Sequence, residues 1–387
     1  MNKSHEIYTR ATDVMPGGTT RATVFVSPNP PYAIRGEGYE VTDEDGIIVI
    51  DCNNNYTSLI HGHAQPDILA AAHEAAQHGT AFGLPTRYEV DMAAELQSRT
   101  ELPHWRFLNS GTEAVMLLIR AARAYTGRDV IIRFDGSYHG TYDNVVDPAA
   151  KGIPHAVSAS VIVLPQNDID ALEAVMASRG HEVAAVLIDL MPNRAGLTPA
   201  TQQYVDRLQE LTTKYGALLA VDEVISFRLG YGGFHHQYGL HPDLMSLGKV
   251  IGGGYPVGAV GGKREVLSSF NPFEEQSVAW GGTFTANPVT MAAGLAALKQ
   301  FDHDAVTRLN GMGDKLRQIL AEEGITANGT GSLVRLITQD PKQNWWNLYQ
   351  NGILAGTNGL LALSTPMNDE LVEDIAVRVI KANRAST

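Results

Sequence analysis

The chain has 387 residues, of which 44% are hydrophobic, enough to build one large or two moderate domains around buried cores. Its 29 basic and 42 acidic side chains give a net charge of −13 at pH 7, which repels phosphate backbones and anionic lipids. This charge argues against nucleic-acid binding and membrane binding as the main role of the protein.

Short alternating segments open the chain. Residues 32–35, 39–42 and 47–50 are rich in β-branched and aromatic side chains, and the turn signal Asp45-Gly46 separates the last two, so a small sheet is predicted here. From about residue 85, helical patterns at 88–99 and 113–125 alternate with apolar runs at 106–108, 130–134, 161–164, 183–190 and 217–221. This alternation predicts an α/β fold with a mostly parallel central sheet and helices on both of its faces.

The pattern changes again after about residue 270. A long helix is predicted at 288–301, followed by mixed elements at 333–337, 344–351 and 360–364 and a final helix at 369–382. We expect residues 1–50 and 271–387 to pack together as a smaller α+β domain beside a large domain at 51–270.

The sequence also indicates a compartment. Its first residues contain no apolar signal segment, and no apolar run is long enough to cross a bilayer. The single cysteine, Cys52, cannot form an intrachain disulfide, which is typical of a reducing compartment. We therefore expect a cytoplasmic protein that does not bind membranes.

Lys249 is the first candidate for a chemical role. It follows the apolar run Leu244-Met245-Ser246-Leu247 and Gly248, and a glycine triplet at 252–254 comes after it. Burial in such a segment would disfavour the ammonium form and lower the pKa of the amine, which a Schiff-base lysine requires. An ordinary loop lysine fits the same segment equally well.

Asp222 is the second candidate. It ends the apolar run at 217–221, so its carboxylate is expected at the carboxyl end of a buried strand, where open α/β sheets bind ligands. A carboxylate in that place can keep a pyridine nitrogen protonated, so that the ring accepts electrons from a substrate carbanion. A helix cap and a metal ligand are the ordinary alternatives for a strand-end aspartate.

A strand-to-helix turn at 108–114 has the features of a phosphate site. Ser110, Gly111 and Thr112 follow an apolar strand, and a predicted helix begins at once with Glu113. The N–H groups at the start of a helix and two hydroxyls would suit an anionic phosphate. The alternative is a plain helix cap, the commoner meaning of this pattern.

Tyr138 and His139 lie between two glycines after the run at 130–134. An aromatic ring in this position could stack on a flat cofactor, with the histidine behind it. A turn with an exposed Tyr-His pair explains the segment equally well.

Together these segments resemble a known family. The chain is similar to class III (fold type I) PLP-dependent aminotransferases, above all to the branch of glutamate-1-semialdehyde aminomutases and β-amino-acid aminotransferases. The similarity covers nearly the whole chain, and the matching segments are 15–18, 62–66, 109–114, 138–140, 221–224, 247–254 and 282–284. It implies pyridoxal 5'-phosphate (PLP) as cofactor and transfer of an amino group between an amino acid or amine, such as a β-amino acid, and a keto acid.

The resemblance implies which residues contact the cofactor ring. Tyr138 would stack on one face of the ring with His139 behind it, and Val224 would pack on the other face. Asp222 would pair with the ring nitrogen. Lys249 would hold the cofactor as a Schiff base and then move the proton between the substrate and the cofactor.

The resemblance also implies which residues bind the phosphate. Ser110, Gly111 and Thr112 would hold it within one subunit. Thr283 matches a threonine that reaches the phosphate of the neighbouring subunit. A homodimer with shared active sites is therefore expected.

Two arginines are candidates for binding the substrate. Arg21 matches the arginine that grips the substrate carboxylate in this branch, and a planar guanidinium suits that task because it donates two parallel hydrogen bonds. Arg194 stands where relatives often have Glu or Asn, and we expect it to share the carboxylate with Arg21. The alternative is that Arg194 is a surface residue that balances a nearby acid.

Some segments depart from the family. Asp189-Leu190 stands where Glu-Pro is common, the long glycine-rich lid of the aminomutase is not found around 143–160, and the region near 330–333 also differs. An aminotransferase therefore ranks above an aminomutase. A racemase stays a further alternative, because all three reactions begin with the same carbanion.

Other classes of function fit less well. Two histidine pairs, His61 with His63 and His235 with His236, have no neighbours that would complete a metal site. A hydrolase that used Ser110 would need a Gly-x-Ser-x-Gly turn, which the sequence lacks there. A cofactor-binding sensor without activity would not need both the lysine and the aspartate described above.

Overall fold

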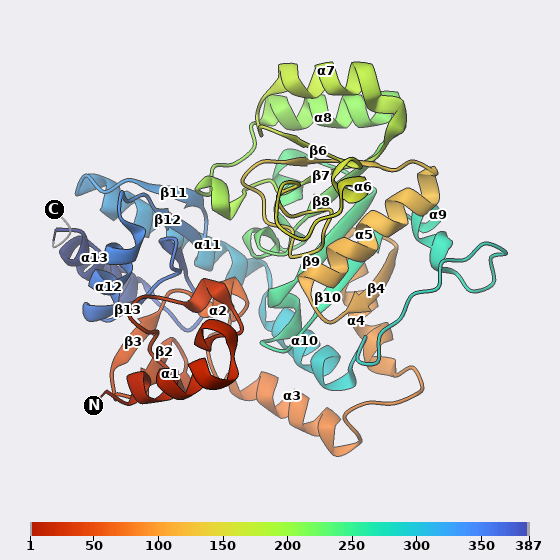
Figure 1. The fold of residues 1–387 in the computed structure, drawn as a ribbon. Helices are drawn as coiled ribbons and strands as arrows, with labels where there is room; N and C mark the ends of the chain where they lie inside the picture. The colour runs from red at the N-terminus through yellow and green to blue at the C-terminus, as the bar shows by residue number, and fades with distance from the viewer. Residues whose placement is uncertain (1, 385–387) are drawn as a thin grey trace. The chain divides into compact units, whose positions relative to one another are not determined.

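A seven-stranded sheet organises the middle of the chain in the computed structural model, which describes residues 2–384 (Figure 1). Its strand order is β4-β10-β9-β8-β7-β5-β6. The pairs β9–β8, β8–β7, β7–β5 and β5–β6 are parallel, and β10 runs antiparallel to both of its neighbours. The strands are His104–Leu108 (β4), Val130–Phe134 (β5), Val161–Leu164 (β6), Val183–Ile188 (β7), Leu218–Asp222 (β8), Leu244–Gly248 (β9) and Gly258–Gly262 (β10).

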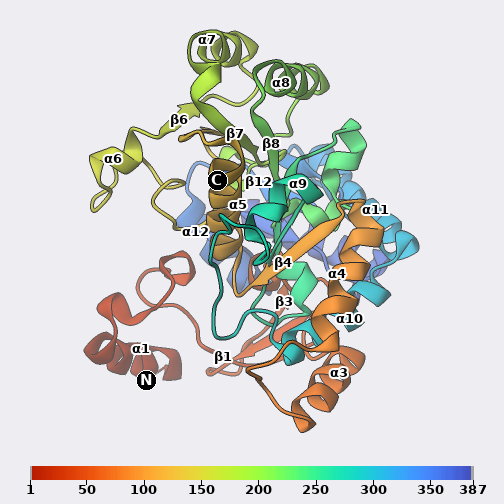
Figure 2. The same cartoon turned by 90° about the vertical axis from the view of Figure 1, so that its right-hand side faces the viewer.

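Both faces of this sheet are covered. All residues of β5, β7, β8, β9 and β10 are buried, although successive side chains along a strand point to opposite faces. The helix Gly111–Thr126 (α5) packs across β4 and β7 to β10, while Ile169–Arg179 (α7) and Gln202–Tyr215 (α8) lie side by side (Figure 1 and Figure 2). The continuous apolar runs of the sequence are explained by this burial, and the predicted mostly parallel sheet is confirmed.

Strand β10 consists largely of glycine, which lets the chain approach β4 closely. A Cβ atom on Gly258 would lie 2.0 Å from the carbonyl oxygen of Ser110, and one on Gly261 would lie 2.5 Å from the ring of Trp105. Because glycine is rare in strands, the sequence pattern did not predict this element. The close approach matters for the site, since it fixes the position of Ser110 at the end of β4.

The other helices of this large unit are Pro66–Gln77 (α3), Arg87–Thr100 (α4), His155–Ser158 (α6), Arg264–Leu267 (α9) and Pro288–Gln300 (α10). Helix α10 packs on α4 and on the 3-10 turn Lys249–Gly252. Gly294 permits this packing, because a Cβ atom there would lie 2.2 Å from the carbonyl oxygen of Ile251. The large compact unit spans residues 67–306, whereas the large domain was expected at 51–270.

The second unit combines the chain up to Pro66 with the chain from Thr307 onward. Its two sheets have the strand orders β1-β2-β3-β13 and β11-β12-β14, and the parallel pairing of β13 with β3 joins the two terminal segments. The strands are Ala33–Glu37 (β1), Glu40–Asp43 (β2), Ile48–Asp51 (β3), Ala327–Thr330 (β11), Leu333–Leu336 (β12), Ile353–Leu354 (β13) and Leu360–Ala362 (β14). The helices are Lys3–Val14 (α1), Asn54–Thr57 (α2), Pro341–Gln350 (α12) and Asp369–Arg384 (α13), and the boundary between the units falls within His303–Glu322 (α11).

The short element α2 is a left-handed turn. Its four residues, none of them glycine, have φ angles of 50° (Asn54), 48° (Asn55), 55° (Tyr56) and 76° (Thr57). The left-handed conformation costs an ordinary L-residue about 1–2 kcal/mol, and less for asparagine, whose side chain can bond locally. Surrounding contacts must therefore hold this turn in place.

Cys52, just before that turn, is fully buried, and burial raises the pKa of its thiol far above the usual range. Among residues 2–384, none of the helices is both long enough and apolar enough to cross a membrane.

Candidate active site

The carboxyl ends of β8 and β9 bring Asp222 and Lys249 to the same edge of the large unit's sheet. Asp222 is the last residue of β8 and pairs in register with Ser246 of β9, three residues before Lys249. Lys249 itself has a φ of 49°, in the left-handed region that residues other than glycine rarely adopt. Such backbone strain concentrates at functional sites, where the surroundings hold a residue in one orientation.

The amine of Lys249 is partly buried, and this burial lowers its pKa to about 8. The negative charges of Asp222 and Asp189 act in the opposite direction but do not cancel the effect. A lysine with this pKa supplies neutral amine near neutral pH, as a nucleophile requires.

Asp222 is held by two hydrogen bonds in the interior of the large unit. Its Oδ2 lies 2.6 Å from Nδ1 of His139, which we take to donate because a carboxylate accepts, and its Oδ1 accepts from the N–H of Val224 at 3.0 Å. Nε2 of His139 is buried and has no partner among the described residues. His139 thus orients Asp222. The sequence around Tyr138 did not indicate this contact.

A second acid, Asp189, lies near enough to this pair to interact with both charges. Asp189 follows β7, is buried, and accepts a hydrogen bond from the N–H of Met191 at 3.0 Å. Burial raises the pKa of Asp189 to about 7, and the nearby charge of Asp222 adds to the rise. This aspartate occupies the sequence position where the family commonly has glutamate.

The turn at 110–112 forms a small cup at the start of α5. Oγ of Ser110 accepts from the N–H of Glu113 at 3.2 Å, so Ser110 is indeed a helix cap. The N–H groups of Gly111 and Thr112, by contrast, lie in the first turn of α5, where a helix supplies no partner for them. A helix cap and a phosphate site are compatible in this segment, since the Ser110 hydroxyl caps the helix while the helix supplies no partner for the two N–H groups.

Glycines bring the cup next to Val224 and β9. A Cβ atom on Gly111 would lie 3.0 Å from Cγ1 of Val224, and one on Gly248 would lie 3.6 Å from Cα of Gly111. On the other side, a Cβ atom on Gly140 would lie 2.4 Å from Oγ1 of Thr112. The segments that carry the cup, Val224, Lys249 and the Tyr138 turn thus meet in one place.

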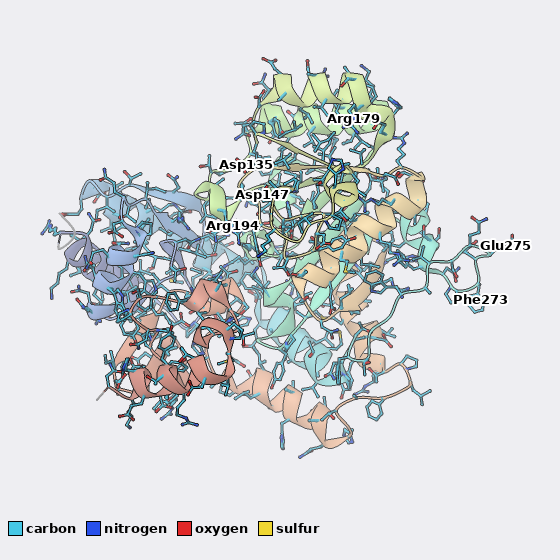
Figure 3. All side chains as sticks on the ribbon, in the orientation of Figure 1. Asp135, Asp147, Arg179, Arg194, Phe273 and Glu275 are labelled. Carbon is cyan, nitrogen blue, oxygen red and sulfur yellow. The ribbon has the colours of Figure 1, made fainter. Side chains whose placement is uncertain are left out.

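Tyr138 is 38% exposed, and the guanidinium of Arg194 lies over its ring with Cζ 4.2 Å from the centroid. This distance fits a cation–π contact. The turn after Pro192 can approach because a Cβ atom on Gly136 would lie 2.6 Å from Cβ of Ala195. Arg194 is exposed (Figure 3). Among the described residues it forms no ion pair with a carboxylate, so charge balance with a nearby acid does not account for its position.

These features fit pyridoxal phosphate. The start of α5 offers N–H groups to a dianionic phosphate, glycines leave room beside it, and the buried Asp222 suits a protonated ring nitrogen. The pKa of Lys249 suits attachment to an aldehyde. The predicted cofactor residues of the large unit that the structure brings together are Ser110, Gly111, Thr112, Tyr138, His139, Asp222, Val224 and Lys249.

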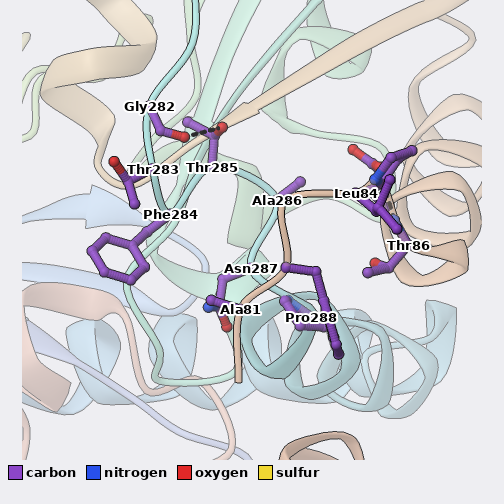
Figure 4. A pocket seen from close by; sticks show the side chains of 14 residues that line it. Ala81, Leu84, Thr86, Gly282, Thr283, Phe284, Thr285, Ala286, Asn287 and Pro288 are labelled. Carbon is purple, nitrogen blue, oxygen red and sulfur yellow. Dashed lines mark hydrogen bonds between the residues drawn. The ribbon is translucent and has the colours of Figure 1, made fainter. Parts of the chain in front are cut away.

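Thr283 lies elsewhere in the large unit. It is exposed and lines a cavity of about 260 Å³ between residues 81–86 and 282–288 (Figure 4). Arg21 belongs to the smaller unit, where its guanidinium donates to Oδ1 of Asn55 at 2.8 Å.

The histidine pairs have protein partners. Nδ1 of His235 lies 2.9 Å from Oε1 of the buried Glu223, and Nε2 of His63 lies 2.7 Å from Oδ2 of Asp51. His61 contacts the hydroxyl of Thr365 at 2.9 Å. Over residues 2–384, no three histidine, cysteine or acidic side chains are grouped so as to hold a metal ion.

Comparison with known proteins gives the family. The family model for class III aminotransferases matches residues 26–356. A glutamate-1-semialdehyde 2,1-aminomutase from Aeropyrum pernix is 39% identical over 341 residues, which are 84% of this chain and 79% of that protein.

Solved structures are similar over nearly the whole chain. One described as a transaminase with PLP bound has a TM-score of 0.96 at 40% identity and covers 99% of this chain and 97% of its own. A β-phenylalanine aminotransferase from Variovorax paradoxus has a TM-score of 0.91 at 32% identity and covers 97% of this chain and 92% of its own.

These matches confirm the predicted fold type I architecture and pyridoxal phosphate as the cofactor. The site in the large unit has the groups that this cofactor needs. The chain belongs to the class III aminotransferases and is a transaminase that depends on pyridoxal phosphate.

Proposed function

We propose that the enzyme moves an amino group between an amine that bears a carboxylate and a keto acid, with Lys249 as the attachment point of the cofactor. The observation that carries this proposal is the partly buried Lys249 amine, with its pKa lowered to about 8, within reach of the charge on Asp222. β-Amino acids are the donor class to test first, because a β-phenylalanine aminotransferase is 32% identical to the chain.

In this proposal, different residues of the large unit bind the cofactor ring and transfer the proton. Bound pyridoxal phosphate supplies an electron-accepting ring that stabilises negative charge on the reacting carbon of the substrate. Asp222 keeps the ring nitrogen protonated, and His139 and the N–H of Val224 hold its carboxylate in one orientation. Lys249 would move the proton from that carbon to the cofactor, and back in the second half of the reaction.

Tyr138 and the start of α5 position the cofactor. We propose that the Tyr138 ring stacks on the cofactor and that the N–H groups and hydroxyls of Ser110, Gly111 and Thr112 bind its phosphate. The contact of Arg194 with Tyr138 supports a place for Arg194 at the edge of the same site.

An intramolecular amino shift is the second candidate, favoured by the name of the Aeropyrum pernix relative. It uses the same groups on a substrate that carries both the amine and the carbonyl. A screen of donors and acceptors separates the candidates: keto-acid formation from a separate acceptor supports transamination, and loss of chirality in recovered donor would indicate racemisation.

Lys249 should carry the cofactor covalently. Borohydride treatment of the yellow holoenzyme should fix pyridoxal phosphate on Lys249, as peptide mapping by mass spectrometry would record. Lys249→Ala should lose nearly all turnover, because the covalent attachment and the proton carrier are both removed. Lys263→Ala, which removes an ion pair with Asp243 at a neighbouring strand end, is the matched control and should keep its turnover. Cofactor found on a different lysine would refute the assignment.

Asp189 should make the stability of the cofactor-free protein depend on pH. An aspartate of the unfolded chain ionises near pH 4, whereas the folded Asp189 has a pKa of about 7. Between these values the unfolded chain releases a proton that the folded protein keeps, so stability falls as pH rises. Asp189→Asn has no proton to lose at this position. The difference between its melting temperature and that of the wild type should therefore increase from pH 4 to 7 and stay constant above pH 7.

Thermal unfolding at a series of pH values measures this difference. Asp135→Asn, which changes an exposed carboxyl in the same unit, is the control and should show no such trend. A difference between Asp189→Asn and the wild type that stays constant from pH 4 to 8 would contradict the raised pKa.

Arg21 and Arg194 should together bind the substrate carboxylate. Arg21→Ala and Arg194→Ala should each weaken apparent transition-state binding of a carboxylate-bearing amine by roughly 2–5 kcal/mol, and spare an uncharged amine of similar size. Values of kcat/KM for the two amines measure this. Arg179→Ala removes an exposed ion pair with Glu182 and serves as the control. Equal losses for both amines, or none, would show that the arginines do not form a carboxylate clamp.

The enzyme should be a homodimer in which Thr283 reaches the phosphate of the partner. Exposed apolar side chains support an interface on the large unit: Phe273 is 94% exposed on a projecting loop (Figure 3), and Leu84 and Phe284 line the cavity that contains Thr283 (Figure 4).

Light scattering should give twice the 41.7 kDa of one chain. Thr283→Ala should lose pyridoxal phosphate faster on dialysis while its melting temperature changes little. A fully active monomer would disprove the shared site.

A further inference from the structure

The side chain of one asparagine, Asn55, holds the guanidinium of Arg21. Nη1 of Arg21 donates to Oδ1 of Asn55 at 2.8 Å. Asn55 is the second residue of the left-handed turn α2, with a φ of 48°. Both residues belong to the smaller unit, so this contact lies within one compact unit of the chain.

The next residue of the turn holds the backbone near Arg21. The hydroxyl of Tyr56 donates to the carbonyl oxygen of Thr23, and Oγ1 of Thr357 donates to the same oxygen at 3.1 Å. The ring of Tyr56 also lies beneath the guanidinium, with Cζ of Arg21 5.9 Å from its centroid. Two consecutive residues of one turn therefore fix both the side chain of Arg21 and the loop that carries it.

The turn is anchored in the core of the smaller unit. Oδ1 of the buried Asp51 accepts from the N–H groups of Asn53 and Asn54, each at 2.8 Å. Oδ1 of Asn53 accepts from the N–H of Tyr56 at 2.6 Å, and Nδ2 of the fully buried Asn54 donates to the carbonyl oxygen of Ala362 at 2.6 Å. These bonds hold the turn left-handed, and the direction of the Asn55 side chain follows from that conformation.

Within residues 2–384, the other N–H donors of Arg21 have no hydrogen-bond partner. A guanidinium has five N–H donors in a planar fork, and none of the carboxylates in residues 2–384 forms an ion pair with Arg21. Arg21, Asn55 and Tyr56 line a cavity of about 440 Å³ in the smaller unit, large enough for a small ligand. The partner of Arg21 is a neutral amide, so the guanidinium is held without losing its charge to a protein carboxylate.

We propose that Asn55 is a positioning residue that sets the specificity for carboxylate substrates by aiming Arg21 while leaving its charge unpaired. The inference rests on the proposed function, in which Arg21 binds the substrate carboxylate. The left-handed turn is the device that directs the Asn55 amide to Arg21. An aspartate at this position would accept the same hydrogen bond but would compete with the substrate for the guanidinium.

Asn55→Gly is the informative variant, because glycine adopts a φ of 48° without strain and removes only the amide. The KM for a carboxylate-bearing amine should rise about tenfold, equivalent to 1.4 kcal/mol, while kcat and the KM for an uncharged amine stay within about twofold. The inhibition constant of butanoate, which has a carboxylate and no amine, should rise by a similar factor, whereas that of butanamide should not. Asn55→Asp should also raise the KM for the carboxylate-bearing amine alone.

Asn167→Gly is the matched control, since Asn167 also has a positive φ of 69° and its amide bonds to the loop around Pro199 in the large unit. Its KM values for the two amines should change by the same factor. Melting temperatures of both glycine variants show whether folding is intact.

Two results would overturn the inference and are distinguishable. If Arg21→Ala loses preference for the carboxylate and Asn55→Gly does not, the positioning role is wrong and carboxylate binding by Arg21 stands. If Arg21→Ala itself leaves the preference and the butanoate constant unchanged, the proposed carboxylate role of Arg21 fails, and the role of Asn55 fails with it.

Discussion

The rest of the site depends on one constraint, a buried carboxylate at the end of β8. An ionised Asp222 away from water is stable only with partners, and His139 and the N–H of Val224 provide them. His139 comes from the loop after β5, so this single contact ties together two strand ends that are far apart in sequence. The same charge acts on Asp189 and on Lys249. It adds to the effect of burial in raising the pKa of Asp189, and it opposes the effect of burial in lowering the pKa of Lys249.

Close backbone approach is the second condition of the site. Gly258 lets β10 lie against Ser110, Gly111 touches Val224, and Gly140 touches Thr112. At each contact a side chain would fill the space or displace the neighbour. The cup at the start of α5 therefore owes its position to glycines on three different segments, and hydrogen bonds alone would not create it.

The sequence predicted those parts of the fold that have a strong local signal. Strands β5 and β6 match the apolar runs residue for residue, because both are short runs bounded by turn residues. Lys249 and Asp222 were identifiable because each stands at the end of such a run. Strand β10 was not predicted, because its glycine-rich segment shows neither the helical nor the strand period. The boundary expected near residue 270 came from a change of sequence pattern, whereas the large compact unit extends to residue 306 and includes the packing of α10 on α4.

Side-chain partners were harder to predict than element positions. Nothing local indicates that His139 bonds to Asp222, or that Arg194 covers Tyr138, because each contact joins separate loops. The run Asn53-Asn54-Asn55 did contain a signal, since asparagine is the residue other than glycine that best tolerates a positive φ. Three consecutive asparagines indicate a loop in the sequence. Only the structure shows that the turn is left-handed and that it contacts Arg21.

The burial of Cys52 has a practical consequence. It is the only thiol of the chain, it has no exposed surface, and its raised pKa leaves almost no thiolate at neutral pH. Maleimide dyes and spin labels react with thiolate, so the native fold gives them no target. One cysteine introduced at an exposed position in each unit would therefore accept probes selectively, and the distance between those probes could be followed in solution without first removing a native residue.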